Sequence, residues 1–146
     1  MWKKLLATSN SLPLAILRVT LGIVMFPHGA QKMLGWFGGQ GFAATMGGFE
    51  HQGIPAVFAC LAILAEFLGG LGLIFGLLSR IAAFGILCNM VVAVLRVHAS
   101  NGLFMNWTGT HKGEGFEYHL LAIAMAIVVM AAGAGAWSLD RRLARK

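Results

Sequence analysis

The residues of this sequence that could do chemistry are polar side chains embedded in long apolar stretches. They are Arg18, His28, Glu66, Asn89, Arg96, His98, Glu117 and His119. An ionisable group in hydrocarbon costs about 2.5–3.5 kcal/mol on insertion scales, so such a group usually marks a functional site or a charge partner. Histidines and carboxylates in a helical bundle can ligate a metal or haem iron, relay protons, or hydrogen-bond the carbonyl oxygens of a quinone.

The depths of these groups predict that several of them share one layer of the membrane. Counting about 1.5 Å per residue from the cytoplasmic end of each predicted helix places His28, His98 and His119 at about 24, 26 and 28 Å. Glu117 falls about 3 Å beyond His119, and Glu66 lies deeper, at about 18 Å. We therefore expect three histidines and a carboxylate in the outer half of the membrane, with Glu66 beneath them.

The neighbours of two of these residues predict that their side chains point into the bundle. Membrane helices pack through small residues. Glu66 shares its helical face with Ala62 and Gly69, and His119 shares its face with Ala122 and Ala126. Both side chains are therefore expected to face other helices.

These residues define a candidate site with distinct expected roles. The carboxylates expected to be catalytic are Glu66 and Glu117. The groups expected to bind a cofactor are His28, Glu66, His98 and His119, and the same three histidines form a speculative set of metal ligands. No compact ligand motif such as HExxH or CxxC is present, so the signal for a metal is weak, and a quinone, a metal and haem all stay open.

Two arginines are expected to be structural charge partners of the carboxylates. Arg18 lies about 9 Å up the first helix, and we expect it to hold Glu66 ionised across an axial offset of roughly 9 Å. Arg96 is expected to orient Glu117. A structural interpretation also stays open, in which Arg96 and Glu117 form a fixed ion pair and His98 is an interfacial residue in contact with water.

The elements that must position these residues are four apolar runs, at about residues 12–34, 55–78, 81–98 and 117–137. The chain has 146 residues, of which 58% are hydrophobic and 11% charged, whereas soluble domains carry about 25% charged residues. Each run approaches the roughly 20 residues that a helix needs to cross a bilayer. The runs do not alternate apolar with polar residues as the strands of a membrane β-barrel do. We therefore predict an all-α integral membrane four-helix bundle, with residues 1–146 forming a single domain.

The positive charges predict the orientation of the bundle. The formal net charge is +6, and most of the basic residues flank the apolar runs. They are Lys3, Lys4, Arg80, Arg141, Arg142, Arg145 and Lys146. Because Lys and Arg are enriched in cytoplasmic loops, both termini are predicted to be cytoplasmic. The charges form no basic stripe with partners for nucleic acid bases, so nucleic acid binding is excluded.

Two local features of the outer half carry further predictions. Pro27 precedes His28, and a proline removes a backbone hydrogen bond, so we expect the first helix to be kinked or opened there. Phe42, Met46 and Phe49 share one helical face. This spacing predicts a short helix from Gly41 lying on the outer membrane surface.

The order of short motifs resembles that of the DoxX family of small bacterial inner-membrane proteins, over nearly the whole chain. In the first helix the motifs are Leu17-Arg18, Gly22 and His28-Gly29-Ala30-Gln31-Lys32. In the second they are Glu66, Gly69-Gly70 and Gly76-Leu77-Leu78-Ser79-Arg80. Toward the end they are His98 with Gly102-Leu103-Phe104, Gly115-Phe116-Glu117-Tyr118, and the run from Gly133 to Asp140, in which Ala134 stands where the family commonly has a proline.

The resemblance implies a multi-pass four-helix protein of the bacterial inner membrane. It also implies a redox connection, because related subunits belong to thiosulfate:quinone oxidoreductases and other members are linked to redox or oxidant-defence systems. The matched positions include His28, Glu66, His98 and Glu117. His119 is not carried over from the family, and its expected role depends on the depth count.

Three functional hypotheses follow. The first is a redox-associated membrane subunit that binds a quinone or metal cofactor in the outer half, with a soluble or membrane redox protein as partner. The second is a small-solute or proton-coupled transporter, which the mid-membrane Glu66 would suit. The third is a structural membrane partner of a redox or oxidant-defence complex without chemistry of its own. Enzymatic activity, the substrate and assembly into a homo-oligomer stay open.

Overall fold

The protein is mainly helical in the part that the computed structural model describes, residues 2–145. Its helices in chain order are α1 (Trp2–Leu6), α2 (Leu12–Leu34), α3 (Gly41–His51), α4 (Ala56–Phe75), α5 (Ser79–Ala93), the π-helical turn η1 (Val94–His98), the 3-10 turn η2 (Ala99–Asn101), α6 (Glu117–Ala132) and α7 (Leu139–Ala144). Within residues 2–145 there is no strand. The predicted all-α fold class is confirmed.

Three helical segments are long and apolar enough to cross a membrane: Leu12–Leu34, Ala56–Phe75 and Ser79–Asn101. The fourth predicted span is shorter than expected, because α6 ends at Ala132 rather than near residue 137. Its 16 residues extend about 24 Å, somewhat less than the roughly 30 Å of a hydrocarbon core. Gly133 follows with a φ of 89°, which turns the chain out of the helix.

The two local predictions for the outer half have different outcomes. The short helix predicted from Gly41 is present as α3. Of the kink or opening predicted at Pro27, the opening is wrong, because α2 stays helical past Pro27 to Leu34, and the kink stays a prediction. His28 therefore lies on a continuous helix, one turn before Lys32.

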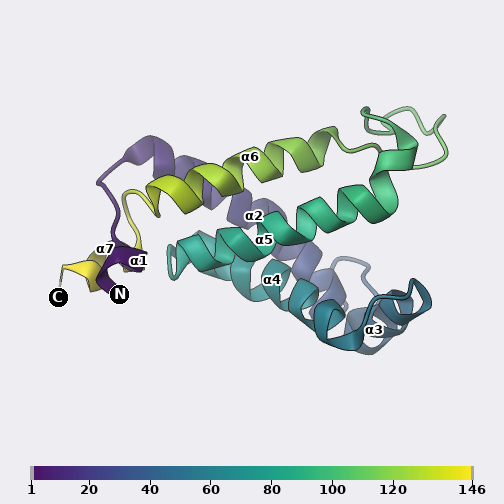
Figure 1. Cartoon of the computed structure of the whole chain (residues 1–146), viewed down its shortest axis with the longest axis horizontal. Helices are drawn as coiled ribbons and strands as arrows, with labels where there is room; N and C mark the ends of the chain where they lie inside the picture. Colours follow the sequence, from purple (N-terminus) through teal and green to yellow (C-terminus); the bar gives the residue numbers. More distant parts are fainter. Residues whose placement is uncertain (1, 146) are drawn as a thin grey trace.

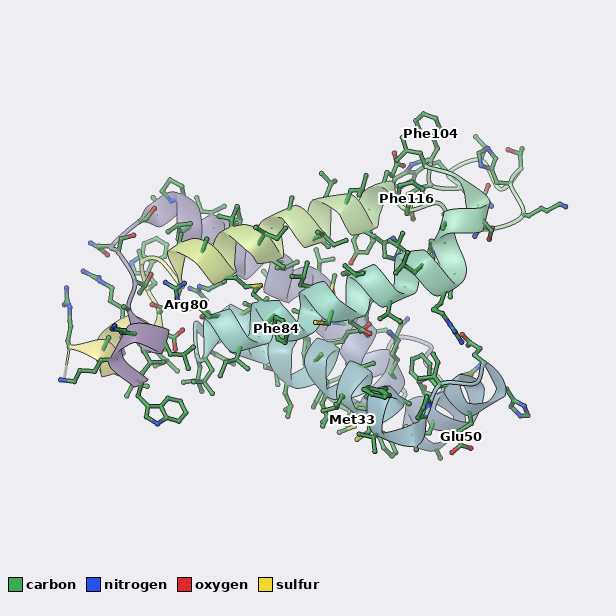
Figure 2. All side chains as sticks on the ribbon, in the orientation of Figure 1. Met33, Glu50, Arg80, Phe84, Phe104 and Phe116 are labelled. Atoms are coloured by element: carbon green, nitrogen blue, oxygen red, sulfur yellow. The ribbon has the colours of Figure 1, made fainter. Side chains whose placement is uncertain are left out.

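The four long helices form a bundle in which sequence neighbours pack side by side (Figure 1). α4 packs between α2 and α5, and α5 packs between α4 and α6. The core includes Leu21 and Met25 of α2, Ile86 of α5 and Val129 of α6. Both termini, with α1 and α7, lie at one end of the bundle, and α3 lies at the other, as the predicted topology requires. The apolar side chains on the outward faces of the helices (Figure 2) are those that lipid would cover.

The backbones of α2 and α4 approach so closely that side chains larger than hydrogen do not fit between them. A Cβ atom added at Gly29 would lie 2.3 Å from the backbone nitrogen of Phe67. One added at Gly70 would lie 2.8 Å from the Cα atom of Phe26. Small residues allow membrane helices this kind of contact. It also places the outer turns of α2 directly against Glu66.

The end of the bundle that carries both termini is held by polar side chains bonded to backbone, and we call it the terminal junction. Its residues are Arg18, Arg80, Ser138 and Asp140. The Arg18 side chain is fully buried and donates to five backbone carbonyls. They belong to Leu73, Ile74, Ala134, Ala136 and Trp137. These carbonyls lie at the end of α4 and in the non-helical segment after α6, where regular helical hydrogen bonding ends.

The predicted pairing of Arg18 with Glu66 is therefore wrong, although the structural role of Arg18 is evident from its contacts. The carboxylate at this end is Asp140, which is 2% exposed. Asp140 accepts from the backbone N–H groups of Leu78 at 2.6 Å and Ser79 at 2.8 Å, and so caps the start of α5. Arg80, labelled in Figure 2, donates to the carbonyls of Met130, Ala131 and Ala7.

Candidate functional site

A buried ion pair joins α2 and α4 in the half of the bundle away from the termini. Lys32 donates from Nζ to both carboxylate oxygens of Glu66, at 2.6 and 2.5 Å. Asn89 of α5 donates from Nδ2 to Oε1 of Glu66 at 2.7 Å. The Glu66 side chain is 4% exposed, whereas that of Lys32 is 32% exposed. We call Lys32, Glu66 and Asn89 the polar triad, and it links three helices.

The close packing of small residues explains how the triad forms. Gly29 touches the backbone of Glu66 and Phe67, so the side chain of Lys32, one turn later on the same face of α2, reaches the carboxylate. On the other side, a Cβ atom at Gly85 of α5 would lie 3.1 Å from Cβ of Ala65, so α5 also lies close to α4. The predicted inward orientation of Glu66 is correct, and Lys32 is its partner in place of Arg18.

Lys32 is the residue of this site that the sequence interpretation did not select. It enters there only as the last residue of the motif His28-Gly29-Ala30-Gln31-Lys32. The signal that could have identified it is its spacing, because Lys32 follows Gly22 and Gly29 by ten and three residues on the same helical face. A lysine that continues a stripe of small residues faces the neighbouring helix rather than the lipid.

A row of aromatic and imidazole rings lies between α2, α6 and the end of α5. The ring centroids of His28 and Tyr118 are 6.2 Å apart, and those of Tyr118 and His119 are 5.3 Å apart. His119 and His98 follow at 4.1 Å, with ring planes inclined by 40°. The structure thus brings together His28, His98 and His119, which the depth count predicted, and adds Tyr118. We call these four residues the His–Tyr row.

Two polar atoms of the His–Tyr row are buried without a hydrogen-bond partner. They are the phenolic oxygen of Tyr118 and Nδ1 of His119. The His119 residue is 6% exposed, which confirms its predicted inward orientation. Leaving a buried donor or acceptor unpaired costs about 1–3 kcal/mol. Such groups in a native fold call for a bound molecule or water that completes them.

The two ends of the row differ in their surroundings. His28 is exposed on α2. His98 ends the π-helical turn η1, and its Nδ1 lies 2.8 Å from the carbonyl oxygen of Glu114 in the loop before α6. Single π-helical turns are rare and occur frequently at functional sites, because the extra residue changes which face the next side chains occupy.

The hydrogen bonds of the Glu117 side chain go to neither the polar triad nor the His–Tyr row. Its Oε1 atom accepts from the backbone N–H of Met105 at 2.8 Å and from Nε1 of Trp107 at 3.3 Å. Arg96 is exposed and donates to the carbonyl of Gln52 at 2.7 Å. The predicted pairing of Arg96 with Glu117 is therefore wrong. The contacts of Glu117 order the loop between η2 and α6, and its expected catalytic role stays a prediction.

The speculative metal site is not formed. In the part of the chain covering residues 2–145, no three His, Cys, Asp or Glu side chains come together in a way that could hold a metal ion. The site offers imidazole, phenol, amide, carboxylate and ammonium groups, all of which form hydrogen bonds.

An open cavity of about 390 Å³ lies where α3 meets the end of α2. Its polar lining residues are Gln31, Lys32, Gln40, Thr45 and Gln52. Lys32 therefore belongs both to the wall of this cavity and to the polar triad. Because the ammonium group bonds both oxygens of Glu66, it forms the boundary between the cavity and the buried carboxylate.

Comparison with known proteins assigns the chain to a family. The DoxX family profile matches residues 13–99. An uncharacterized membrane protein of Mycobacterium tuberculosis is 32% identical, over 99% of this chain and 90% of that protein. The inner membrane protein YqjF of Escherichia coli is 31% identical over 77% of this chain and 82% of its own length.

A third relative carries a functional name. The Bacillus subtilis protein named "Putative oxidoreductase CatD" is 32% identical over 56% of this chain and 57% of its own length. No solved structure matches the chain significantly. The profile covers more than half of the chain, and the first two relatives are membrane proteins by name, which agrees with the apolar helices described above. The chain is a multi-pass membrane protein and belongs to the DoxX family.

Proposed function

We propose that this protein is a redox-associated membrane subunit whose His–Tyr row binds the head group of a membrane quinone. The observation that carries the proposal is the pair of buried, unpartnered polar atoms, Oη of Tyr118 and Nδ1 of His119. A quinone head offers two carbonyl oxygens on a flat ring, and it can accept hydrogen bonds from a phenol and from an imidazole protonated at Nδ1. The neighbouring rings of the row supply flat surfaces against which such a ring can pack.

The position of the row favours a ligand that arrives from the membrane. His28 is exposed at one end of the row, on a helix whose other exposed residues include Ile23 and Val24. A molecule dissolved in the lipid can therefore reach Tyr118 alongside His28. The oxidoreductase name of the Bacillus subtilis relative supports the same direction.

The residues of the chain would have separate tasks in this function. Tyr118 and His119 would hold and orient the head group. The polar triad would hold a proton-exchanging carboxylate nearby, since Glu66 is the buried acid of this half of the bundle. A bound quinone supplies the electron and proton acceptor chemistry, and the protein supplies binding, orientation and proton delivery.

Binding can be tested with the protein in lipid nanodiscs. An azido-labelled long-chain ubiquinone is photo-crosslinked to it, and decylubiquinone competes. We expect Tyr118→Phe and His119→Gln each to weaken binding by about two- to tenfold, the loss of one net hydrogen bond of about 0.5–1.5 kcal/mol. His111→Gln is the matched control, because His111 is an exposed histidine of the outer loop. Crosslinking that decylubiquinone does not reduce would overturn the proposal.

The stability of the quinone-free protein gives a second readout of opposite sign. Tyr118→Phe removes the unpaired buried hydroxyl, so we expect the free energy of unfolding to rise, by up to about 1 kcal/mol. A variant that binds less tightly and is also more stable without ligand is the signature of a binding group. Loss of stability together with unchanged quinone binding would mean that Tyr118 is a structural residue.

A further inference from the structure

We propose that the cavity beneath α3 is the aqueous route through which Glu66 exchanges protons with the outer side of the membrane, with Lys32 as the relay. The inference rests on the proposed function only for the use to which the protons are put. The route itself depends on the contacts of Lys32, the polar lining of the cavity and the fold of the segment before α3.

The first argument is the double position of Lys32. Its Nζ atom contacts both oxygens of Glu66, and its side chain also lines the cavity. The exposed fractions, 32% for Lys32 and 4% for Glu66, place the lysine on the accessible side of the carboxylate. A proton that travels between the cavity and Glu66 therefore meets the ammonium group of Lys32 first.

The second argument is the character of the cavity. Its lining includes three glutamines, a threonine and the lysine, together with glycines, Ala44 and Phe49, so part of its wall offers hydrogen bonds to water molecules. None of its lining residues is an Asp or Glu. A cavity of about 390 Å³ has room for several waters, each occupying about 30 Å³ in the liquid. Lys32 is thus the titratable group of the lining.

The third argument is that the chain folds so as to place this cavity at the end away from the termini. Gly39 lies against Gln31 so closely that an added Cβ atom would be 2.3 Å from the carbonyl oxygen of Gln31. This contact brings the segment before α3 back onto the end of α2, and α3 then lines the same cavity as Lys32. By the positive-inside rule, this end faces the outer side of the membrane.

The proton transfer is balanced in two steps. In the first, the ammonium of Lys32 gives a proton to the carboxylate of Glu66, which leaves a neutral amine and a neutral carboxylic acid. In the second, the amine takes a proton from a hydronium ion in the cavity, which leaves water. The net change is one proton taken up by Glu66 from the outer aqueous phase, and the reverse sequence releases one.

Access to the cavity is tested by labelling from one side of the membrane. In a background carrying Cys60→Ala and Cys88→Ala, Thr45→Cys places a thiol in the cavity lining. We expect a membrane-impermeant methanethiosulfonate to modify it when added outside right-side-out vesicles. A separate Cys60→Ala variant that keeps Cys88 is the control, because Cys88 lines an apolar groove between α4 and α5 and should react with an apolar maleimide but not with the charged reagent. Modification of residue 45 only from the cytoplasmic side, or not at all, overturns the route.

The relay is tested by Lys32→Arg, which keeps a positive charge beside Glu66 but does not give up its proton. Protonation of Glu66 after a pH jump is followed by infrared spectroscopy as the carboxylic C=O band that Glu66→Gln removes. We expect Lys32→Arg to slow this protonation at least tenfold, while Lys112→Arg in the outer loop leaves it unchanged. An unchanged rate in Lys32→Arg overturns the relay.

Neither assay contains a quinone, so the two proposals can fail separately. If residue 45 is labelled from outside and Lys32→Arg slows the protonation of Glu66, but no quinone binds, the proton route stands and the redox role does not. Quinone binding with no sided labelling would leave the redox role and remove the route.

Discussion

The terminal junction and the half of the bundle away from the termini differ in how their buried polar groups are bonded. At the junction, Arg18 and Asp140 bond to backbone groups that the ends of α4, α5 and α6 leave free. In the outer half, the buried charge of Glu66 is bonded to side chains, and Tyr118 keeps its only polar side-chain atom unpaired. Hydrogen bonds to backbone fix the positions of the helix ends. Side chains that bond to other side chains, or that lack a partner, can still bind a ligand or exchange a proton.

The contrast holds although the junction also has unpartnered atoms. They are Oγ of Ser79 and Nε of Arg80. Arg80 nonetheless donates through both terminal nitrogens, and the backbone of Ser79 is bonded to Asp140. The junction is therefore expected to control stability, and the outer half is expected to control function.

The largest effect should come from Arg18→Met, which removes the hydrogen bonds to five carbonyls at once. We expect the free energy of unfolding to fall by about 3–5 kcal/mol, because buried backbone groups lose their charged partner. Thermal unfolding of the purified protein in detergent measures the change. Arg96→Met is the matched control, since Arg96 is exposed and bonds a single carbonyl, and it should change stability by less than about 1 kcal/mol. Equal effects of the two variants would remove the contrast.

An intermediate effect is expected from breaking the ion pair of the polar triad. Lys32→Met leaves the Glu66 carboxylate buried beside Asn89 alone, and we expect a loss of about 2 kcal/mol of unfolding free energy, because the lysine is partly exposed. Adding Glu66→Gln should restore about half of this loss. Unfolding of both single variants and the double variant gives the coupling energy, with Lys112→Met as the control for removing a loop lysine. Strictly additive losses would show that the pair does not act as one unit.

The smallest effect is expected from Glu117→Gln. Its carboxylate accepts two hydrogen bonds from the outer loop, and the amide oxygen of glutamine can still accept them. We expect a loss of less than about 1 kcal/mol and unchanged quinone crosslinking. Hydrogen exchange at the amide of Met105 would detect the weakened loop contact. Quinone binding that falls as far as in Tyr118→Phe would instead restore Glu117 to the site.

The fold was largely predictable, because each helix is indicated by the residues of its own segment. Runs of apolar residues, flanking Lys and Arg, and the face shared by Phe42 and Met46 indicated the helices and their order. The end of α6 was not predictable from hydropathy, because residues 133–137 are as apolar as a helix. Their departure from helical geometry depends on Gly133, with its positive φ, and on Arg18, which satisfies the freed carbonyls.

The candidate site was predictable in its depth but not in its pairing. A count of helical rise placed three histidines in one layer, since rise per residue is constant. Rotation and lateral distance depend on which helices touch and on how closely. Gly29 decides the pairing, because its contact with Glu66 and Phe67 brings Lys32, rather than the more distant Arg18, to the carboxylate. Unpaired atoms such as those of Tyr118 and His119 become visible only once all neighbours are placed.

The π-helical turn at Val94–His98 makes the site depend on chain length as well as on side-chain identity. A π-helical turn holds one more residue than an α-helical turn, so every residue after it occupies a different face of the helix. The contact between His98 and His119 is therefore set by a single additional peptide unit upstream. In evolutionary terms, an insertion or deletion of one codon in this stretch could create or abolish the imidazole contact without altering any of the four side chains that form the row.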